Sequence, residues 1–488
     1  MQKFKFLSTF TAIGLSMTLL FGCTNEEVSE PVDAAAPAEE NEATGGSEEA
    51  TASDTPKNVI VMVGDGMGLG QMEVARLLEY GKEGELHMES LEHTALLRTY
   101  SANNWVTDSA AAGTAIATST KTDNGMIGVN PDGESVASIL ELFRNDGKQV
   151  GIISNNTVTD ATPAAFTANV ETRAGQDEIA RQLFEREYDL MLGGGSNYFQ
   201  PDRQDGDDLV EMFEEKGYSV VTDRDELLAA DSPERLLGLF HPAFMNYKVD
   251  MDLYESNEPT LNEMTDVALD MLSQHEDGFF LMVEGARIDH ASHAADITSV
   301  WQETIEFDNT VADVLSWMEE RDDTLLIVLA DHETMGIAAS EVMDKEALRN
   351  VSASPEYMVG QFEFDEENGV YLTASVQSII EEYSGVVLSD EEVKAFNEYI
   401  YDDEGELRFP HEQAWEIGSF IADHYQAGVM NRDIRAASAT GGHTGNMVPV
   451  FATGLGADRF NGVLDNTDIS HIIAEISQLE TAPGEVEK

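Results

Sequence analysis

Continuous apolar runs rich in β-branched residues alternate along the chain with segments of helical periodicity. Short apolar runs of this kind are typical of strands that are buried on both faces of a parallel sheet. The runs lie at 58–63, 149–154, 278–283, 324–330 and 447–453. Helical segments separate them, at 135–145, 176–187, 263–274 and 298–318. This alternation predicts an α/β fold with a mostly parallel central sheet and helices on both faces.

One stretch between the last two predicted strands is longer than a strand–helix unit needs. It contains aromatic and acidic positions such as Phe362, Phe364 and Trp415. We expect residues 341–430 to form an inserted subdomain, like a cap or crown, that covers or flanks a site. The whole folded domain is predicted to span residues 57–488.

The N-terminus has the pattern of a secretory signal. Lys3 and Lys5 precede an apolar run over 6–21, and Cys23 follows it after a glycine. Residues 1–22 resemble a bacterial lipoprotein signal, which implies that a lipid is attached to Cys23 after cleavage. A plain signal peptide and an uncut membrane anchor remain alternatives. Residues 23–56 are acidic and poor in large apolar groups, which predicts a flexible tether.

Composition narrows the classes of function. The 488 residues include 93 Asp and Glu against 27 Lys and Arg, so the net charge is −66 and binding to nucleic acid is not expected. A hydrophobic content of 42% excludes wholesale disorder. The single cysteine excludes a disulfide framework, a cysteine-rich zinc site and a CxxC redox motif. The acidic excess indicates adaptation to high salt, with simple solubility as the alternative.

Acidic residues and a histidine stand where predicted strands end. Asp65 follows the first strand between two glycines, Glu284 follows the third, and Asp331 and His332 follow the fourth. Ligands of open α/β sheets bind beyond the carboxyl ends of the strands. We therefore expect these side chains to contribute to one metal site.

A second group has the residue types that zinc prefers. Asp289 and His293 are four positions apart and share one face of a helix. His290 lies beside them, and His443 occupies a glycine-rich loop that we expect to be flexible. Each has an alternative interpretation: an acid-capped helix start on the surface for the first pair, and a structural or exposed histidine for His443.

Ser109 is the candidate nucleophile. It opens a run of small residues, and a helix beginning there would place its N-terminus beside an anion. No histidine neighbours it in the sequence and no GxSxG motif is present, so metal activation is expected rather than a Ser-His-Asp triad. The alternative is that Asp108 or Ser109 is only a helix cap.

Three further residues could serve a phosphate and a hard cation. Asp160 and Thr162 offer oxygen ligands suited to Mg²⁺. Arg173 can contact two phosphate oxygens at once. Its alternative is a surface ion pair with Glu171 or Asp177.

Taken in order, these segments resemble bacterial alkaline phosphatases. The motifs are GDGMG, TDSAAAGTA, DATPAAF, Arg173, VEGARIDHASH, ADHE and TGGHTG. The resemblance implies that Ser109 becomes phosphoserine and that Arg173 holds the phosphate. It implies one zinc on Asp289, His293 and His443, and another on Asp65, Asp331 and His332.

The resemblance also implies a third metal on Asp65, Thr162 and Glu284, with Asp160 close by. We expect magnesium there, although the combination of Asp160 with His290 leaves zinc or cobalt open. Asp108 and His290 are counted with Arg173 as candidate substrate-binding residues. The implied reaction is hydrolysis of small phosphate monoesters at alkaline pH by an exported, lipid-anchored enzyme, with a homodimer possible.

Other functions stay open at this point. A phosphodiesterase or sulfatase of the same superfamily is the nearest alternative. A diesterase would be expected to lack Arg173 and the magnesium set, and a sulfatase would need a modifiable residue in a different motif. A lipoprotein that binds divalent cations without catalysis is the alternative from another class.

Overall fold

The computed structural model describes residues 55–402 and 404–486. Cys23, the predicted signal over 1–22 and nearly all of the predicted tether lie outside the described residues. Among those that are described, no helix is both long and apolar enough to cross a bilayer.

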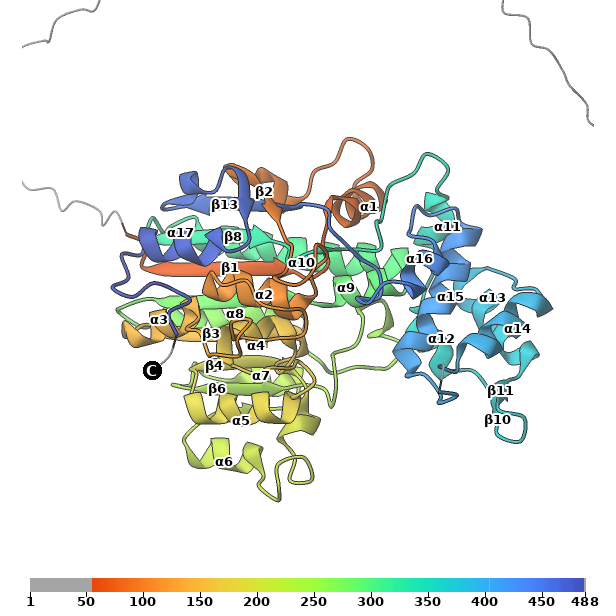
Figure 1. Ribbon diagram of the computed structural model, residues 1–488, viewed down its shortest axis with the longest axis horizontal. Coiled ribbons are helices and arrows are strands. Elements are labelled where there is room, and N and C mark those ends of the chain that lie inside the picture. Colours follow the sequence, from red (N-terminus) through yellow and green to blue (C-terminus); the bar gives the residue numbers. More distant parts are fainter. Residues whose placement is uncertain (1–54, 403, 487–488) are drawn as a thin grey trace, which may run out of the picture. The chain divides into compact units, whose positions relative to one another are not determined.

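A ten-stranded sheet forms the centre of the fold (Figure 1). Its strands are β1 (Asn58–Gly64), β2 (His93–Arg98), β3 (Gln149–Thr157), β4 (Leu190–Gly194), β5 (Ser219–Val221), β6 (Leu236–Leu239), β7 (Phe279–Gly285), β8 (Thr324–Leu329), β13 (Val448–Gly454) and β14 (Gly462–Asp465). Their order is β14-β2-β13-β8-β1-β7-β3-β4-β6-β5. All five predicted strands are present. The sequence pattern did not predict β2, β4, β5, β6 and β14.

One strand differs from the prediction in direction. The run at 447–453 was predicted with the parallel strands, but β13 pairs antiparallel with both β8 and β2. Hydrophobic pattern cannot distinguish the two directions, because a strand buried on both faces is apolar throughout in either case. The reversal places the start of β13 at the edge where the parallel strands end, so the segment before it arrives at the same edge as Asp65 and Asp331.

Helices cover the sheet in two groups, as predicted (Figure 1). One group is α2 (Ser109–Thr118), α3 (Ile139–Asn145), α4 (Ala161–Thr167) and α17 (Asp468–Ile476). The other is α1 (Leu69–Glu79), α8 (Leu261–Leu272), α9 (Arg287–His293) and α10 (Ile297–Met318). Nearer the β5 edge lie α5 (Gln176–Arg186), α6 (Leu209–Glu215) and α7 (Arg224–Ala229).

The helix predicted at 135–145 begins later than expected. The Ser138 side chain accepts a hydrogen bond from the backbone N–H of Glu141, and the Glu141 carboxylate accepts one from the Ser138 backbone. This capping box starts α3 at Ile139.

A second hydrophobic core lies within the long segment before β13. Its helices are α11 (Lys345–Arg349), α12 (Pro355–Gly360), α13 (Thr373–Ser384), α14 (Asp390–Tyr399), α15 (Pro410–His424) and α16 (Arg432–Ala436), with the short hairpin β10 (Phe364–Asp365) and β11 (Val370–Tyr371). Buried residues such as Val376, Phe396 and Ile417 pack together there, apart from the core of the sheet. The bounds 341–430 of the predicted insert remain a prediction.

Candidate active site

Four neighbouring parallel strands, β3, β7, β1 and β8, deliver acidic residues to one edge of the sheet. In the register of β1, Val63 lies opposite Glu284 of β7 and opposite Leu329 of β8. Asp65 therefore emerges between Glu284 and Asp331. Gly66 follows with φ of +67°, and a Cβ there would lie 2.7 Å from Oδ1 of Asp289, so the turn requires glycine.

His332 stands at the centre of the first cluster. Its Nε2 lies 3.1 Å from Oγ of Ser109, 223 positions away in the sequence. The same nitrogen lies 3.2 Å from Oδ2 of Asp331 and 3.5 Å from Oδ1 of Asp65. In a Ser-His-Asp triad the carboxylate contacts the other ring nitrogen. Here the serine and both carboxylates approach the same nitrogen, Nε2, which differs from the triad geometry.

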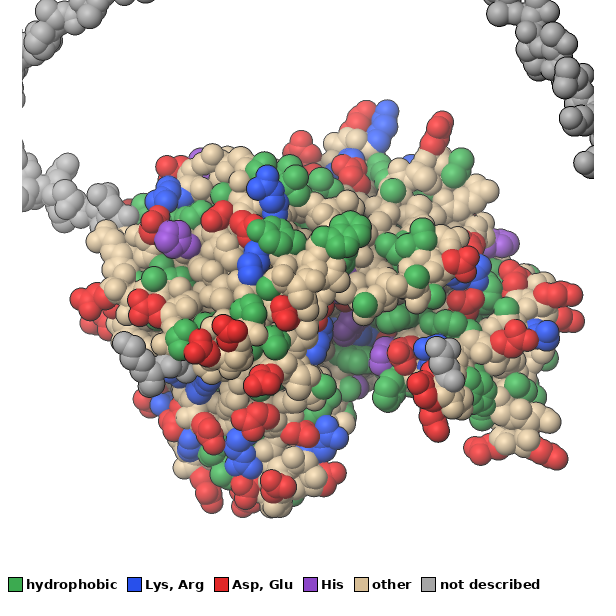
Figure 2. Space-filling model, in the orientation of Figure 1, with side chains coloured by type: hydrophobic (Ala, Val, Ile, Leu, Met, Phe, Trp, Pro, Cys, Tyr) green, Lys and Arg blue, Asp and Glu red, His purple; other side chains and the backbone are tan. Residues whose placement is uncertain are grey.

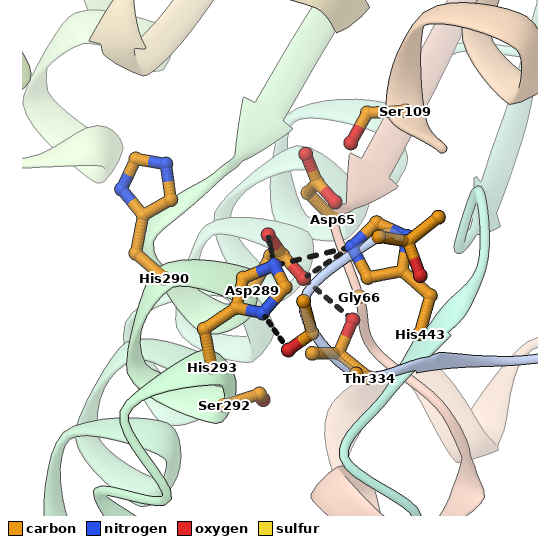
Figure 3. Close-up of polar contacts among 12 residues, drawn as sticks. Asp65, Gly66, Ser109, Asp289, His290, Ser292, His293, Thr334 and His443 are labelled. Atoms are coloured by element: carbon orange, nitrogen blue, oxygen red, sulfur yellow. Dashed lines mark hydrogen bonds and ion pairs between the residues drawn. The ribbon is translucent and has the colours of Figure 1, made fainter. Parts of the chain in front are cut away.

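The second cluster contains Asp289, His293 and His443. Nδ1 of His293 donates to the carbonyl of Gly441 at 2.9 Å, and Nδ1 of His443 donates to the carbonyl of Thr107 at 3.0 Å. In neutral rings both Nε2 atoms then carry lone pairs, yet they lie 3.1 Å apart. Two such nitrogens repel unless a proton or a cation lies between them. Figure 3 shows both rings directed toward Asp289, whose carboxylate is 3.2 Å from His293.

Thr334 connects the two clusters, and the sequence reasoning missed it. Its hydroxyl donates to Oδ1 of Asp289 at 2.5 Å and lies 3.3 Å from Nδ1 of His332. The contact with Nδ1 favours the tautomer of His332 in which Nε2 is free to bind a metal. The position of Thr334, directly after the Asp331–Glu333 motif, was the only available signal.

The loop of His443 is ordered, contrary to our expectation of a flexible one. Its strand β12 (His443–Thr444) pairs antiparallel with β9 (Glu333–Thr334). The Glu333 carboxylate accepts hydrogen bonds from the hydroxyl of Thr444 and from the side chain of Asn446. His443 is consequently buried and fixed against its partners.

Ser109 begins helix α2, as predicted. The side chain of Asp108 caps this helix by accepting the N–H of Ala111 at 3.0 Å. The other oxygen of Asp108 lies 3.5 Å from Nη1 of Arg173, and an oxygen of Asp160 lies 3.5 Å from Nη2. Arg173 thus faces the site between these two acids, not the surface partners Glu171 or Asp177. Burial opposes its charge, but Asp160 and Asp108 raise the pKa of Arg173 further above its ordinary value.

Glu284, Thr162 and Asp65 offer oxygens that are free for a hard cation. Oε1 of Glu284, Oγ1 of Thr162 and Oδ1 of Asp65 are buried and have no hydrogen-bond partner within residues 55–402 and 404–486, and Oδ1 of Asp65 has only the 3.5 Å contact with Nε2 of His332. The second oxygen of Glu284 accepts a hydrogen bond from Ser154 at 2.5 Å, which fixes the carboxylate. Buried polar atoms are rarely left unpaired. This donor set fits a magnesium ion.

The pKa values of the site residues are shifted because many carboxylates are buried close together. Burial first, and then neighbouring acids, raise the pKa of Asp65 well above its usual range. Burial likewise raises the pKa of Glu284 to about 8 and that of Asp331 to about 7, and it lowers the pKa of His332 to about 4. For Asp289 burial acts in the opposite sense, but the imidazoles of His293 and His443 hold its pKa well below the usual value. Bound cations would neutralise the acids and relieve this cost.

Two groups of three side chains lie close enough together for each group to bind one metal ion. The first is Asp289, His293 and His443, and the second is Asp65, Asp289 and His332.

A cavity of about 560 Å³ opens from Ser109 and Arg173 toward the inserted helices. Figure 2 shows a hollow in which histidine, basic and hydrophobic side chains are visible, whereas acidic side chains are scattered over the rest of this face. His290 lines the cavity and in Figure 3 its ring lies apart from Asp289 and His293. Trp415 of α15 lines it too and stacks on His293 at 5.0 Å between ring centres.

Comparisons with known proteins identify related chains. A family model described as alkaline phosphatase matches residues 56–479. The chain is 31% identical over 436 residues to alkaline phosphatase 4 of Bacillus subtilis, covering 86% of this chain and 88% of the relative. It is similar in structure to the alkaline phosphatase of Thermus thermophilus, with a TM-score of 0.77, 29% identity, and 90% and 97% of the two chains covered. A mutant of the TAB5 alkaline phosphatase with Mg bound in its M3 site has a TM-score of 0.62 and 26% identity, with 88% and 99% covered.

Proposed function

The chain belongs to the alkaline phosphatase family and hydrolyses phosphate monoesters, and from that premise we propose how its own residues carry out the reaction. Ser109 is the nucleophile and Arg173 holds the phosphate. Asp289, His293 and His443 bind one zinc ion. Asp65, Asp331 and His332 bind the other. Family membership does not favour a diesterase, a sulfatase or a non-catalytic cation-binding lipoprotein.

The observation that carries this proposal is the convergence on Ser109. Its hydroxyl lies 3.1 Å from a ring nitrogen that two buried carboxylates also approach. Among residues 55–402 and 404–486, the other nitrogen, Nδ1 of His332, contacts the hydroxyl of Thr334 and no carboxylate, so the order serine, imidazole, carboxylate of a triad is not formed there. When bound, divalent cations would lower the pKa of a nearby hydroxyl and stabilise negative charge on the oxygens of the phosphoryl group.

Other residues of the site bind the phosphate and stabilise its charge. The guanidinium of Arg173 can hold two oxygens of the phosphate in its planar fork. Asp108 and Asp160 orient that guanidinium from two sides. The N-terminus of α2 directs its positive end toward the charge that develops beside Ser109.

Two displacements complete the reaction. In the first, Oγ of Ser109 forms a bond to phosphorus as the bond to the alcohol oxygen breaks, and the alcohol leaves with a proton. In the second, water attacks the same phosphorus, the bond to Ser109 breaks, and a proton from the water returns to Oγ of Ser109. Each step inverts the phosphorus centre, so the two together retain its configuration.

The third metal proposed is magnesium, held by Asp65, Thr162 and Glu284 with Asp160 close by. Three of these residues have a buried oxygen that makes no hydrogen bond within residues 55–402 and 404–486, which supports the assignment. The TAB5 mutant that carries Mg in its M3 site is consistent with a hard cation in this family. Metal analysis of active protein should find two zinc ions and one magnesium ion per chain. Active protein without magnesium would overturn the assignment.

The experiment that tests the function compares three esters of p-nitrophenol at alkaline pH with zinc and magnesium present. We expect the phosphate monoester to be cleaved far faster than the bis-ester or the sulfate, and a chelator to abolish turnover until both metals are returned. Faster cleavage of the bis-ester or the sulfate would keep the metal site but refute the substrate. No turnover at either low or molar salt would favour a cation-binding lipoprotein.

We also propose that the protein is exported and anchored through a lipid on Cys23. The support is the sequence pattern around residues 1–23. Mass spectrometry of the N-terminal peptide from membranes should find a lipid-modified cysteine, and release of the Cys23→Ala variant into the medium would agree. The homodimer remains a prediction, which light scattering in solution would decide.

A further inference from the structure

The cavity over Ser109 extends well beyond the space that a phosphate group needs. Its volume of about 560 Å³ is in the range of sites that enclose a whole organic ligand. Ser109, Arg173 and the second metal cluster line one side. The other side is lined by residues from the loop after β6, from α9 and from α15, among them Phe244, His290 and His411.

The ring of Phe244 contacts both of the other two, and we define Phe244, His290 and His411 together as the aromatic wall. The ring of Phe244 meets His290 at 5.2 Å between centres and His411 at 5.9 Å, both edge to face. Phe409, whose side chain is 69% exposed, stacks on His411 at 5.7 Å and extends the row of rings beyond the cavity lining. Phe244 itself is only half-buried, so the cavity and not the core receives part of its surface.

Arg287 holds the wall in place from behind. Its guanidinium is buried between Phe244 and Tyr247, at 4.5 Å and 3.6 Å from the ring centres. One nitrogen lies 2.6 Å from Nδ1 of His290, and another pairs with Glu356 at 3.2 Å. Because Arg287 donates to Nδ1, the neutral His290 ring carries its own proton on Nε2. Contacts of this kind fix the rings before a ligand arrives, and less entropy is lost on binding.

A smaller cavity of about 270 Å³ lies next to this one and shares Phe244, Tyr247, Arg287 and Glu356 with it. Phe244 therefore forms part of the lining of both spaces. A side chain placed in this way limits how far a ligand can enter, and its ring presents the surface on which that ligand rests.

We propose that the aromatic wall binds the alcohol portion of the ester, and that the enzyme prefers phosphate monoesters whose alcohol carries an aromatic ring. This inference rests on the proposed function and names its substrate class. With the phosphate held at Ser109 and Arg173, the ester oxygen points its substituent into the remaining space of the cavity. A planar ring there gains edge and face contacts with three rings, which a polyol such as glycerol cannot make.

The test uses three substrates with aliphatic ester oxygens, so that leaving-group chemistry is similar. Benzyl phosphate carries the ring, cyclohexylmethyl phosphate carries the same bulk without aromaticity, and glycerol 3-phosphate carries neither. For the wild-type enzyme with zinc and magnesium, we expect kcat/KM for benzyl phosphate to exceed that for glycerol 3-phosphate by about tenfold or more. It should exceed that for the cyclohexyl ester by about threefold or more.

Variants locate the effect. Phe244→Leu and His411→Leu keep apolar bulk but remove a ring, and each should reduce the ratio of benzyl to cyclohexylmethyl turnover to near one. Phe364→Ala is the control, because Phe364 is an exposed aromatic of the segment that also contains His411, contacts Tyr371 and does not line the cavity. It should leave all the ratios unchanged. Melting temperatures verify that each variant is folded. Because the result is a ratio of kcat/KM values for one enzyme preparation, a partial loss of active protein does not change it.

Each outcome decides between the hypotheses. Equal kcat/KM for benzyl and cyclohexylmethyl phosphate in the wild type would overturn the preference for aromatic alcohols. A preference that survives both leucine variants, or that falls equally in Phe364→Ala, would overturn its location at the wall. Absence of turnover on all three substrates would instead refute the proposed function itself, which separates the two failures.

Discussion

Replacing Thr334 by valine removes one hydroxyl from between the two candidate zinc clusters and changes the volume of the side chain very little. Thr334 is fully buried, donates to Asp289 at 2.5 Å and contacts Nδ1 of His332 at 3.3 Å. The valine variant leaves Asp289 without this donor and His332 without the contact that favours its tautomer. We expect zinc to bind more weakly at both clusters.

The magnitude follows from the charge of the acceptor. A buried hydrogen bond to a charged group contributes about 1.5–3 kcal/mol, and 1.4 kcal/mol corresponds to a factor of ten. Loss of the Asp289 contact therefore predicts a zinc affinity reduced about 10- to 100-fold, the range found for outer partners of metal ligands. The loss at the His332 contact should be smaller, since 3.3 Å is a long hydrogen bond.

The assay removes the metals and returns zinc in competition with a chromophoric chelator, so that binding is read without reference to activity. Hydrolysis of p-nitrophenyl phosphate is followed in the same titration and should recover in the variant at high zinc. Thr334→Ser keeps the hydroxyl and is the control that should bind zinc like the wild type. If the valine variant binds zinc within twofold of the wild type, or the serine variant loses as much as the valine one, the bridging role of Thr334 is refuted.

Three further predictions concern phosphate binding, pH and salt. Arg173→Lys should raise the inhibition constant of inorganic phosphate about 10- to 100-fold, because a point charge replaces a planar fork; an unchanged constant would contradict the role of Arg173. Burial raises the pKa of Asp250 from 3.8 to about 6, so the folded protein binds this proton more tightly than the unfolded chain does. The free energy of unfolding therefore falls by about 3 kcal/mol as the pH rises through that interval. Asp250→Asn should therefore gain in unfolding free energy relative to the wild type between pH 4 and pH 7, and a difference that is constant with pH would count against the pKa. With a net charge of −66, the unfolding midpoint should rise between low and molar NaCl, and no rise would refute adaptation to salt.

Much of the site could be predicted because its residues directly follow continuous apolar runs. Asp65, Glu284 and Asp331 each stand at the carboxyl end of a parallel strand, and such ends meet at one edge of a sheet whatever the strand order. The four-residue spacing of Asp289 and His293 placed both on one face of α9. These are local signals, and local signals can be read from a single sequence.

The remaining features depend on long-range pairing that leaves no local trace. The direction of β13 and the ladder of β12 with β9 decide where His443 lies, but neither alters the hydrophobic pattern of its own segment. Thr334 acquires its role only when Asp289 and His332 are brought to it. The aromatic wall joins Phe244, His290 and His411 from three separate elements, so its chemistry exists only in the folded chain.

The central claim is that Ser109 itself receives the phosphoryl group. The measurement that tests it most directly is rapid acid quenching of the zinc- and magnesium-loaded enzyme during turnover of p-nitrophenyl phosphate, followed by mass spectrometry of the peptide that contains Ser109. We predict phosphoserine at Ser109 in the wild type. In Ser109→Ala we predict none, with turnover lower by several orders of magnitude and the zinc content unchanged. A phosphorylated residue elsewhere, or a Ser109→Ala variant that turns over like the wild type, would contradict the account.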